Sequence, residues 1–150
     1  MDTINDHMTA DHRRCDAIFE EAERAARAGD LAVLARASSE FLSRITAHIA
    51  VEERLLFPAF EERTGMSGGG PTAVMTEEHR AMGVLFDQMR AAVATNDTTG
   101  YLRASGQMME ILIQHNQKEE MMMYPMLDRV MGGDLAPLLS EVRQALPLVA

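Results

Sequence analysis

The chain carries the same group of metal-ligand side chains twice, 67 residues apart. Two histidines and one glutamate recur: the first copy has His12, His48 and Glu52, and the second has His79, His115 and Glu119. The surrounding sequence recurs with them, because residues 4–60 and 71–127 are identical at fourteen positions without a gap. Four histidines and two carboxylates at matching positions of two similar halves predict a site for two metal ions.

Apolar residues recur at spacings of three and four in both halves, which predicts amphipathic helices and no strand. Gly29-Asp30 and Asn96-Asp97 interrupt the pattern within each half, and a glycine-rich segment ending at Pro71 separates the halves. We therefore expect two helical hairpins, over about residues 3–64 and about residues 71–131. Packed against each other, they form an all-α, up-down-up-down antiparallel four-helix bundle in a single domain covering residues 1–150. A leucine stripe over about residues 134–146 predicts a short fifth helix.

Helix geometry predicts that the six side chains converge. A histidine and a glutamate four residues apart face the same way, so His48 and Glu52 can both point toward the bundle axis. His12 lies 17 residues before Gly29, and His48 lies 19 residues after it, so the two histidines reach similar heights. An unpaired histidine or carboxylate in an apolar core costs several kcal/mol, and six such groups at one height need a cation.

The donor types favour iron. The single cysteine excludes a set of thiolate ligands, which disfavours finger-type zinc and copper(I). Imidazole mixed with carboxylate suits iron, with manganese or zinc as possible occupants. If both glutamates bridge, the six side chains fill about eight of about twelve octahedral positions, and an oxo or hydroxo bridge fills about two more. About one or two positions then remain for O2, peroxide or nitric oxide.

This pattern resembles the hemerythrin-like (HHE cation-binding) family. The residues that carry the resemblance span most of 4–130: Asp11-His12-Arg13, the block from His48 to Pro58, Glu78-His79-Arg80, and the block from His115 to Pro125. The resemblance implies a non-haem, carboxylate-bridged di-iron centre within a four-helix bundle.

The sequence departs from the oxygen-carrying branch of that family at two points. Met75 stands where that branch has a further histidine, four residues before the ligand at the position of His79. His115-x-x-x-Glu119 also replaces a His-x-x-x-x-Asp pattern. The six-ligand pattern looks more like the branch linked to iron-centre repair, iron sensing, or chemistry with peroxide and nitric oxide. The cysteine-bearing N-terminal segment of the repair proteins has no counterpart here, so we expect a stand-alone hemerythrin-like domain.

The charged neighbours of the candidate ligands have two interpretations. Glu53 and Glu120 directly follow the two glutamate ligands, and they either support the ligands or are solvated helix charges. The solvated interpretation is favoured. His7 lies about 140° around the helix from His12, so we expect a surface residue rather than a ligand.

Other reactive side chains are expected to be structural. Cys15 and most of the thirteen methionines are interpreted as core residues. Tyr124 lies half a turn away from His115 on a regular helix, so its ring is expected to pack beneath Pro125. Pro58 and Pro125 each follow a glutamate ligand by six residues and are predicted to kink or tighten their helices.

Composition narrows the partners. A net charge of −9 disfavours nucleic acid and anionic membrane surfaces, and no protein partner is indicated. The chain has neither an apolar run of about 20 residues nor a basic segment before an apolar one, so we expect a cytoplasmic protein.

Three functions remain open at this point. The first is a metal centre that reacts with or senses O2, peroxide or nitric oxide, with no catalytic residue assigned. The second is a module for iron storage, delivery or sensing without turnover. The third is a metal-free helical interaction domain. Reversible O2 carriage is disfavoured by the two departures.

Overall fold

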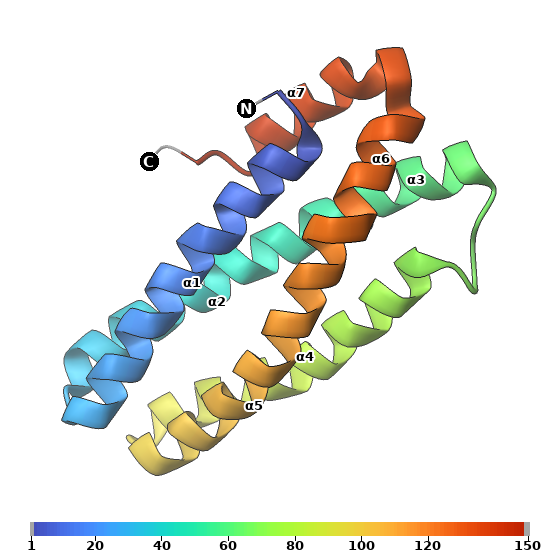
Figure 1. Ribbon diagram of the computed structural model, residues 1–150. Helices are drawn as coiled ribbons and strands as arrows, with labels where there is room; N and C mark the ends of the chain where they lie inside the picture. Colours follow the sequence, from blue (N-terminus) through green and yellow to red (C-terminus); the bar gives the residue numbers. More distant parts are fainter. Residues whose placement is uncertain (1, 149–150) are drawn as a thin grey trace.

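Helices make up most of the computed structural model, which describes residues 2–148 (Figure 1). Helix α1 covers Ile4–Ala28, and α2 covers Leu31–Val51 before a π-helical turn, η1 (Glu52–Leu56), leads into α3 (Phe57–Thr64). Helix α4 covers Pro71–Ala94, and α5 covers Thr98–Lys118 before a second π-helical turn, η2 (Glu119–Met123), leads into α6 (Tyr124–Met131). A 3-10 turn, η3 (Gly132–Asp134), precedes α7 (Leu135–Ala145). The predicted all-α class is confirmed, since no strand occurs within residues 2–148.

The two hairpin turns form where the sequence supplies capping residues. Gly29 ends α1 in the left-handed region with φ 71°, and the Asp30 side chain accepts a hydrogen bond from the backbone N–H of Val33. Asn96 takes a φ of 54° in the second hairpin, and the Asp97 side chain accepts from the N–H of Gly100. These residue types stabilise a helix end and a helix start respectively, so the chain reverses at equivalent points of both halves.

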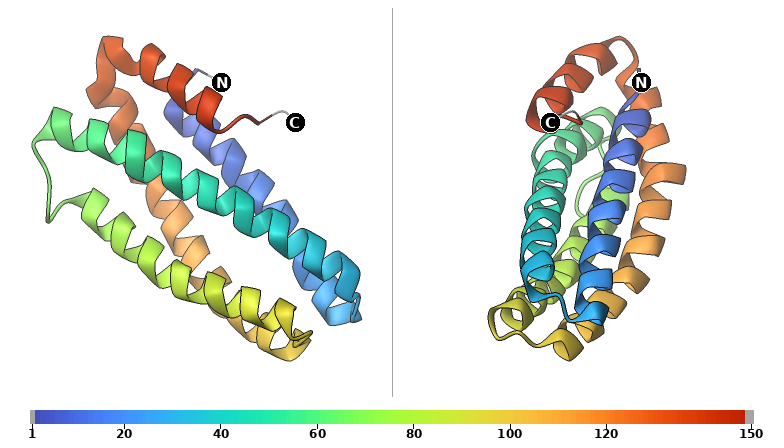
Figure 2. Two further views of the ribbon diagram at one scale, coloured as in Figure 1. Left: turned by 180° about the vertical axis from the view of Figure 1, so that it is seen from behind. Right: turned by 90° about the vertical axis from the view of Figure 1, so that its left-hand side faces the viewer.

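The two hairpins lie side by side as a helical bundle (Figures 1 and 2). Helix α1 packs against α2 and α5, and α4 packs against α5 and α2. Helix α7 lies across the end of the bundle at which α1 begins, and it contacts α1 and α2 there (Figure 2). The loop of residues 65–70 lets α3 extend past the start of α4 (Figure 2). The candidate ligands of the second hairpin thereby come level with those of the first.

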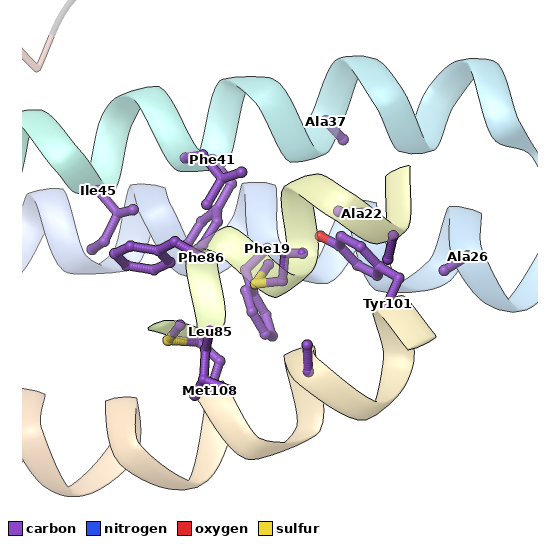
Figure 3. Close-up of a cluster of buried hydrophobic side chains, with 14 of the residues drawn as sticks. Phe19, Ala22, Ala26, Ala37, Phe41, Ile45, Leu85, Phe86, Tyr101 and Met108 are labelled. Atoms are coloured by element: carbon purple, nitrogen blue, oxygen red, sulfur yellow. The ribbon is translucent and has the colours of Figure 1, made fainter. Parts of the chain in front are cut away.

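Two apolar clusters fill the bundle and leave a polar layer between them. The cluster nearer the hairpin turns contains Phe19, Phe41 and Phe86, whose rings meet edge to face (Figure 3). The other cluster joins the opposite ends of the helices to α7. Along α1, for example, Met8 belongs to one cluster and Cys15 to the other, with His12 between them. The same order holds on α2, on α4, and from α5 into η2, so the candidate ligands form one layer across the bundle.

Each π-helical turn begins at a glutamate of the polar layer. The backbone N–H of Phe57 bonds to the carbonyl of Glu52, five residues earlier, and the N–H of Tyr124 bonds to that of Glu119. A proline follows each of these residues, and its ring would clash with the carbonyl four residues before it. The wider turn avoids this clash. The prolines were expected to kink or tighten their helices, but each helix widens instead.

Candidate metal centre

The structure brings all six predicted side chains into one buried cluster. Their ligand atoms form two sets, and within each set the atoms lie within 4.8 Å of one another. The first set comprises His12, His48, Glu52 and Glu119, and the second comprises His79, His115 and the same two glutamates. None of the six residues is more than 6% exposed.

Each glutamate gives one oxygen to each set. In Glu119, Oε1 lies 3.1 Å from Nε2 of His12, and Oε2 lies 3.1 Å from Nε2 of His115. In Glu52, Oε2 lies 3.6 Å from Nε2 of His48, and Oε1 lies 3.1 Å from Nε2 of His79. A carboxylate in this position can bridge two cations.

Every histidine of the cluster has a carboxylate within hydrogen-bond distance of its Nδ1 atom. Nδ1 of His48 lies 2.8 Å from Asp11, and Nδ1 of His115 lies 2.8 Å from Glu78. Because an ionised carboxylate can only accept, Nδ1 donates and Nε2 faces the cluster. This arrangement fixes the ring orientation and is typical of histidines that bind metals.

The other two histidines receive their support from the opposite hairpin. Nδ1 of His12 donates to Glu120 at 2.7 Å, and Nδ1 of His79 donates to Glu53 at 2.6 Å. The interpretation of Glu53 and Glu120 as solvated charges is therefore wrong, although Glu53 keeps 39% of its side-chain surface exposed. The duplication thus repeats two supporting carboxylates in each half, and these four carboxylates orient the four histidines.

Buried atoms of the second set show that a cation fits. Glu52 Oε1, Glu119 Oε2 and His79 Nε2 are buried without a hydrogen-bond partner among the described residues. A buried carboxylate oxygen without a donor costs free energy, and a cation between these atoms would remove that cost. Imidazole and carboxylate together are donors that suit iron, with manganese and zinc as further fits.

Tyr124 reaches the first set, contrary to the expectation that its ring packs beneath Pro125. Its hydroxyl lies 2.6 Å from Glu52 Oε2 and 2.9 Å from Glu119 Oε1. Phe57 occupies the equivalent place in the first half, and its ring stacks on that of His79 with centroids 5.8 Å apart and planes 11° apart. The two halves therefore differ at this position beside the cluster.

Comparison with known proteins agrees with this geometry. Residues 3–144 match the hemerythrin HHE cation binding domain. The chain belongs to the hemerythrin HHE family.

Relatives of this HHE domain include iron-sulfur cluster repair proteins called YtfE. The one from Dickeya chrysanthemi is 40% identical over 55 residues, which are 37% of this chain and 24% of that protein. The one from Edwardsiella ictaluri is 39% identical over 57 residues, 38% of this chain and 26% of that protein. The one from Cronobacter sakazakii is 35% identical over 66 residues, 44% of this chain and 29% of that protein. The match thus spans less than a third of each relative, and no solved structure matches the chain.

Charges within the HHE site shift the pKa values of its members. Burial alone would lower the pKa of His48, but the negative charge of Glu52 and the hydrogen bond to Asp11 raise it to about 10. The pKa of His115 rises to about 9 against the effect of burial, because Glu119 is close. Burial would raise the pKa of Glu52, yet the charge of His48 holds it well below its ordinary value. In the metal-free HHE domain, protonated imidazoles therefore balance the carboxylates, and metal binding would displace those protons.

The pKa of the Tyr124 phenol is shifted as well. Burial, together with the negative charges of Glu119 and Glu52, raises the pKa of this phenol well above its ordinary value. The hydroxyl therefore keeps its proton in the metal-free HHE domain.

The remaining reactive side chains lie outside both sets. His7 is buried rather than on the surface, and its Nε2 lies 2.8 Å from the carbonyl oxygen of Leu146. Cys15 packs in the apolar core as predicted, and burial raises the pKa of its thiol. Within residues 2–148, seven methionines are buried, whereas Met121 and Met122 are exposed.

A surface pocket reaches the second set of this HHE site. It has a volume of about 330 Å³ and is lined by residues of α2, η1 and α4, among them Thr46, Glu53, His79 and Gly83. His79 is a member of the second set, so solvent approaches the cluster from this side. Among residues 2–148, no helix is both long enough and apolar enough to cross a membrane.

Proposed function

We propose that this chain is a non-haem di-iron protein with an open position for O2, peroxide or nitric oxide. His12 and His48 would hold one iron, His79 and His115 would hold the other, and Glu52 and Glu119 would bridge them. One observation carries the proposal: each buried glutamate points one oxygen at each pair of histidines. Such a pair of ions supplies electrons to, or takes them from, a small ligand at its open position.

The protein side chains would orient and tune this centre. Asp11, Glu53, Glu78 and Glu120 hold the four imidazoles through Nδ1, so the rings need no reorganisation when a metal enters. The apolar clusters on both sides of the layer limit water, which strengthens every charge interaction inside it.

The surroundings of the second set favour an open coordination position at the ion that it would hold. Met75 is buried in an apolar cluster near the start of α4, one helical turn before His79, so it adds no nitrogen donor there. The pocket at His79 gives a small ligand a way in. A diatomic molecule or peroxide fits this entrance better than a large organic substrate would, because His79 itself is almost fully buried.

The relatives favour a second candidate function. They are called iron-sulfur cluster repair proteins, and such a name is compatible with iron delivery, storage or sensing without turnover at this site. The two candidates differ in whether a bound metal pair responds to an added small ligand.

Metal content and absorption test the proposal. Protein from iron-replete, reducing expression should contain two irons per chain, measured with manganese and zinc in the same sample. The oxidised protein should absorb in the near ultraviolet, and azide or peroxide should change that spectrum. An iron-loaded protein whose spectrum ignores both reagents would favour delivery or storage. A chain without bound metal would rule out both functions.

Two histidine variants provide a matched pair. His115→Ala removes a member of the second set and should leave fewer than two irons per chain. His7→Ala removes a histidine that is also buried but belongs to neither set, so it should keep both irons. Two irons in His115→Ala would contradict the assignment of this residue.

A further inference from the structure

The hydroxyl oxygen of Tyr124 lies within 3.3 Å of a ligand atom of every residue in the first set. It is 2.6 Å from Glu52 Oε2, 2.9 Å from Glu119 Oε1, 3.2 Å from His48 Nε2 and 3.3 Å from His12 Nε2. Ligand atoms about 2.1 Å from an octahedral ion lie about 3 Å from their neighbours at right angles. The phenol oxygen therefore stands at neighbour distance from all four donors at once.

Hydrogen bonding alone does not satisfy these five atoms once the imidazoles are neutral, the state that metal binding requires. A phenol has one proton to donate. When the imidazoles are neutral, their Nδ1 atoms donate to Glu120 and Asp11, which leaves both Nε2 atoms as acceptors. One proton then faces four acceptors, all within 3.3 Å of the phenol oxygen. A cation that binds all five atoms removes the shortage of donors.

The π-helical turn brings Tyr124 to this place. On a regular helix, five residues turn through about 500°, so Tyr124 would point about 140° away from Glu119. In the turn Glu119–Met123 the backbone N–H of Tyr124 bonds to the carbonyl of Glu119, and both side chains face the cluster. Such turns often occur at functional sites.

The first half of the chain has the same π-helical turn, but the residue that follows it has no hydroxyl oxygen. Phe57 follows the π-helical turn Glu52–Leu56 and stacks on His79, but its ring offers no ligand atom to the second set. The buried atoms of the cluster that lack hydrogen-bond partners within residues 2–148 also belong to the second set: Glu52 Oε1, His79 Nε2 and Glu119 Oε2. The two sets thus differ in the number of protein donors that they offer.

We propose that Tyr124 is a ligand of the metal ion held by His12 and His48, so that exogenous ligands bind only at the ion held by His79 and His115. This proposal rests on the di-iron function proposed above. On binding, the oxygen–metal bond replaces the O–H bond, and the phenol proton passes to solvent. The first ion then has five protein donors, and the second has four.

Visible absorption tests this assignment. A phenolate bound to iron(III) gives a charge-transfer band in the visible range, and excitation within that band enhances tyrosine ring vibrations in resonance Raman spectra. The chain has two tyrosines, and Tyr101 lies in the apolar cluster near the hairpin turns. The oxidised wild type and Tyr101→Phe should both show the band and the ring vibrations. Tyr124→Phe should keep two irons per chain and lose both signals.

The possible outcomes separate the two proposals. A wild type with two irons but no phenolate band would overturn the role of Tyr124 and leave the di-iron function standing. A wild type without iron would overturn the di-iron function itself. If Tyr124→Phe does not fold, Tyr101→Phe decides alone, since a band that persists without Tyr101 comes from Tyr124. Loss of the band in Tyr101→Phe, with folding and iron intact, would refute the assignment.

Discussion

Asp11 connects the candidate metal centre to the C-terminal segment. Its carboxylate is fully buried, and one oxygen accepts from Nδ1 of His48 at 2.8 Å. The other oxygen accepts from Nε of Arg44 at 2.8 Å, and Arg44 also donates to the carbonyl of Pro147 at 2.6 Å. Asparagine at this position keeps the shape but has only one acceptor oxygen. Its NH2 group would face an N–H of either His48 or Arg44.

The expected loss of stability follows from that mismatch. A hydrogen bond to a charged group contributes about 1.5–3 kcal/mol. Removal of one partner from a buried ion pair costs about 3–5 kcal/mol, and asparagine retains part of the pairing. Asp11→Asn should therefore lower the unfolding free energy of the metal-free protein by about 2–4 kcal/mol. Iron affinity should fall about 10- to 100-fold, as for other residues that orient a metal-binding histidine.

Glu78→Gln is the matched control, because Glu78 occupies the equivalent place in the second half. Its carboxylate accepts from Nδ1 of His115 at 2.8 Å and pairs with Lys118, but it keeps 25% of its surface exposed. Water can replace part of what is lost, so its unfolding free energy should change by less than about 1 kcal/mol. Iron affinity should still fall about 10- to 100-fold.

Urea unfolding and chelator competition measure the two effects separately. Unfolding of each metal-free variant in urea, followed by circular dichroism, gives its unfolding free energy. If the slope of this free energy against urea concentration equals that of the wild type, unfolding exposes the same surface and the free energies can be compared. A chromogenic chelator reports iron affinity. Equal unfolding free energies for Asp11→Asn and Glu78→Gln would refute the distinction between the buried and the exposed network. Wild-type iron affinity in both variants would refute their role in orienting the histidines.

Three further outcomes are expected. Phe57→Tyr should place a second phenol near the second set, so the oxidised protein should gain visible absorption and lose its response to azide; an unchanged response would argue against the open position there. Because the pKa of His48 in the folded protein is about 10, above its ordinary 6.5, protonation of this ring stabilises the metal-free fold fully below pH 6.5, and the contribution disappears as the pH rises through 10. Metal-free protein should therefore unfold at a lower urea concentration at pH 10 than at pH 7, and an equal midpoint would contradict this. Gly83→Leu should narrow the pocket at His79 and slow azide binding without loss of iron, whereas Gly106→Leu, in α5, should bind azide at the wild-type rate.

Helix geometry explains why the sequence predicted the convergence of six side chains. Within each half, the two histidines stand at similar distances from the hairpin turn, and each glutamate follows a histidine by four residues. These relations depend on local helix periodicity alone. Local helix periodicity does not determine the height of one hairpin relative to the other. That height depends on the path of residues 65–70.

The π-helical turns explain why Tyr124 was misjudged. Its expected direction was counted on a regular helix, and the wide turn after Glu119 changes the direction of every later side chain. A signal was present, since Pro58 and Pro125 follow the glutamates at the same distance in both halves. A proline ring clashes with the carbonyl four residues before it, so a helix that continues through this position has to widen or bend.

The roles of Glu53 and Glu120 could not be predicted from the sequence for a different reason. Glu120 bonds to His12 and Glu53 bonds to His79, so each of these contacts crosses between hairpins. Local periodicity places both glutamates toward solvent, and only the packing of the second hairpin gives them a partner. His7 was misjudged for the same reason, because the segment that buries it lies 139 residues away in the chain.

The difference between Tyr124 and Phe57 makes the two sets of the duplicated site unequal. On the side of the first set, Asp11 and Arg44 connect His48 to the C-terminal segment, and the phenol faces the donors. On the side of the second set, a pocket reaches His79, and three ligand atoms lack hydrogen-bond partners among the described residues. Changes to the first side should therefore act mainly on folding stability, and changes to the second side on ligand binding. If the proposed di-iron centre forms, one altered ring and one surface pocket would separate a structural metal position from a reactive one.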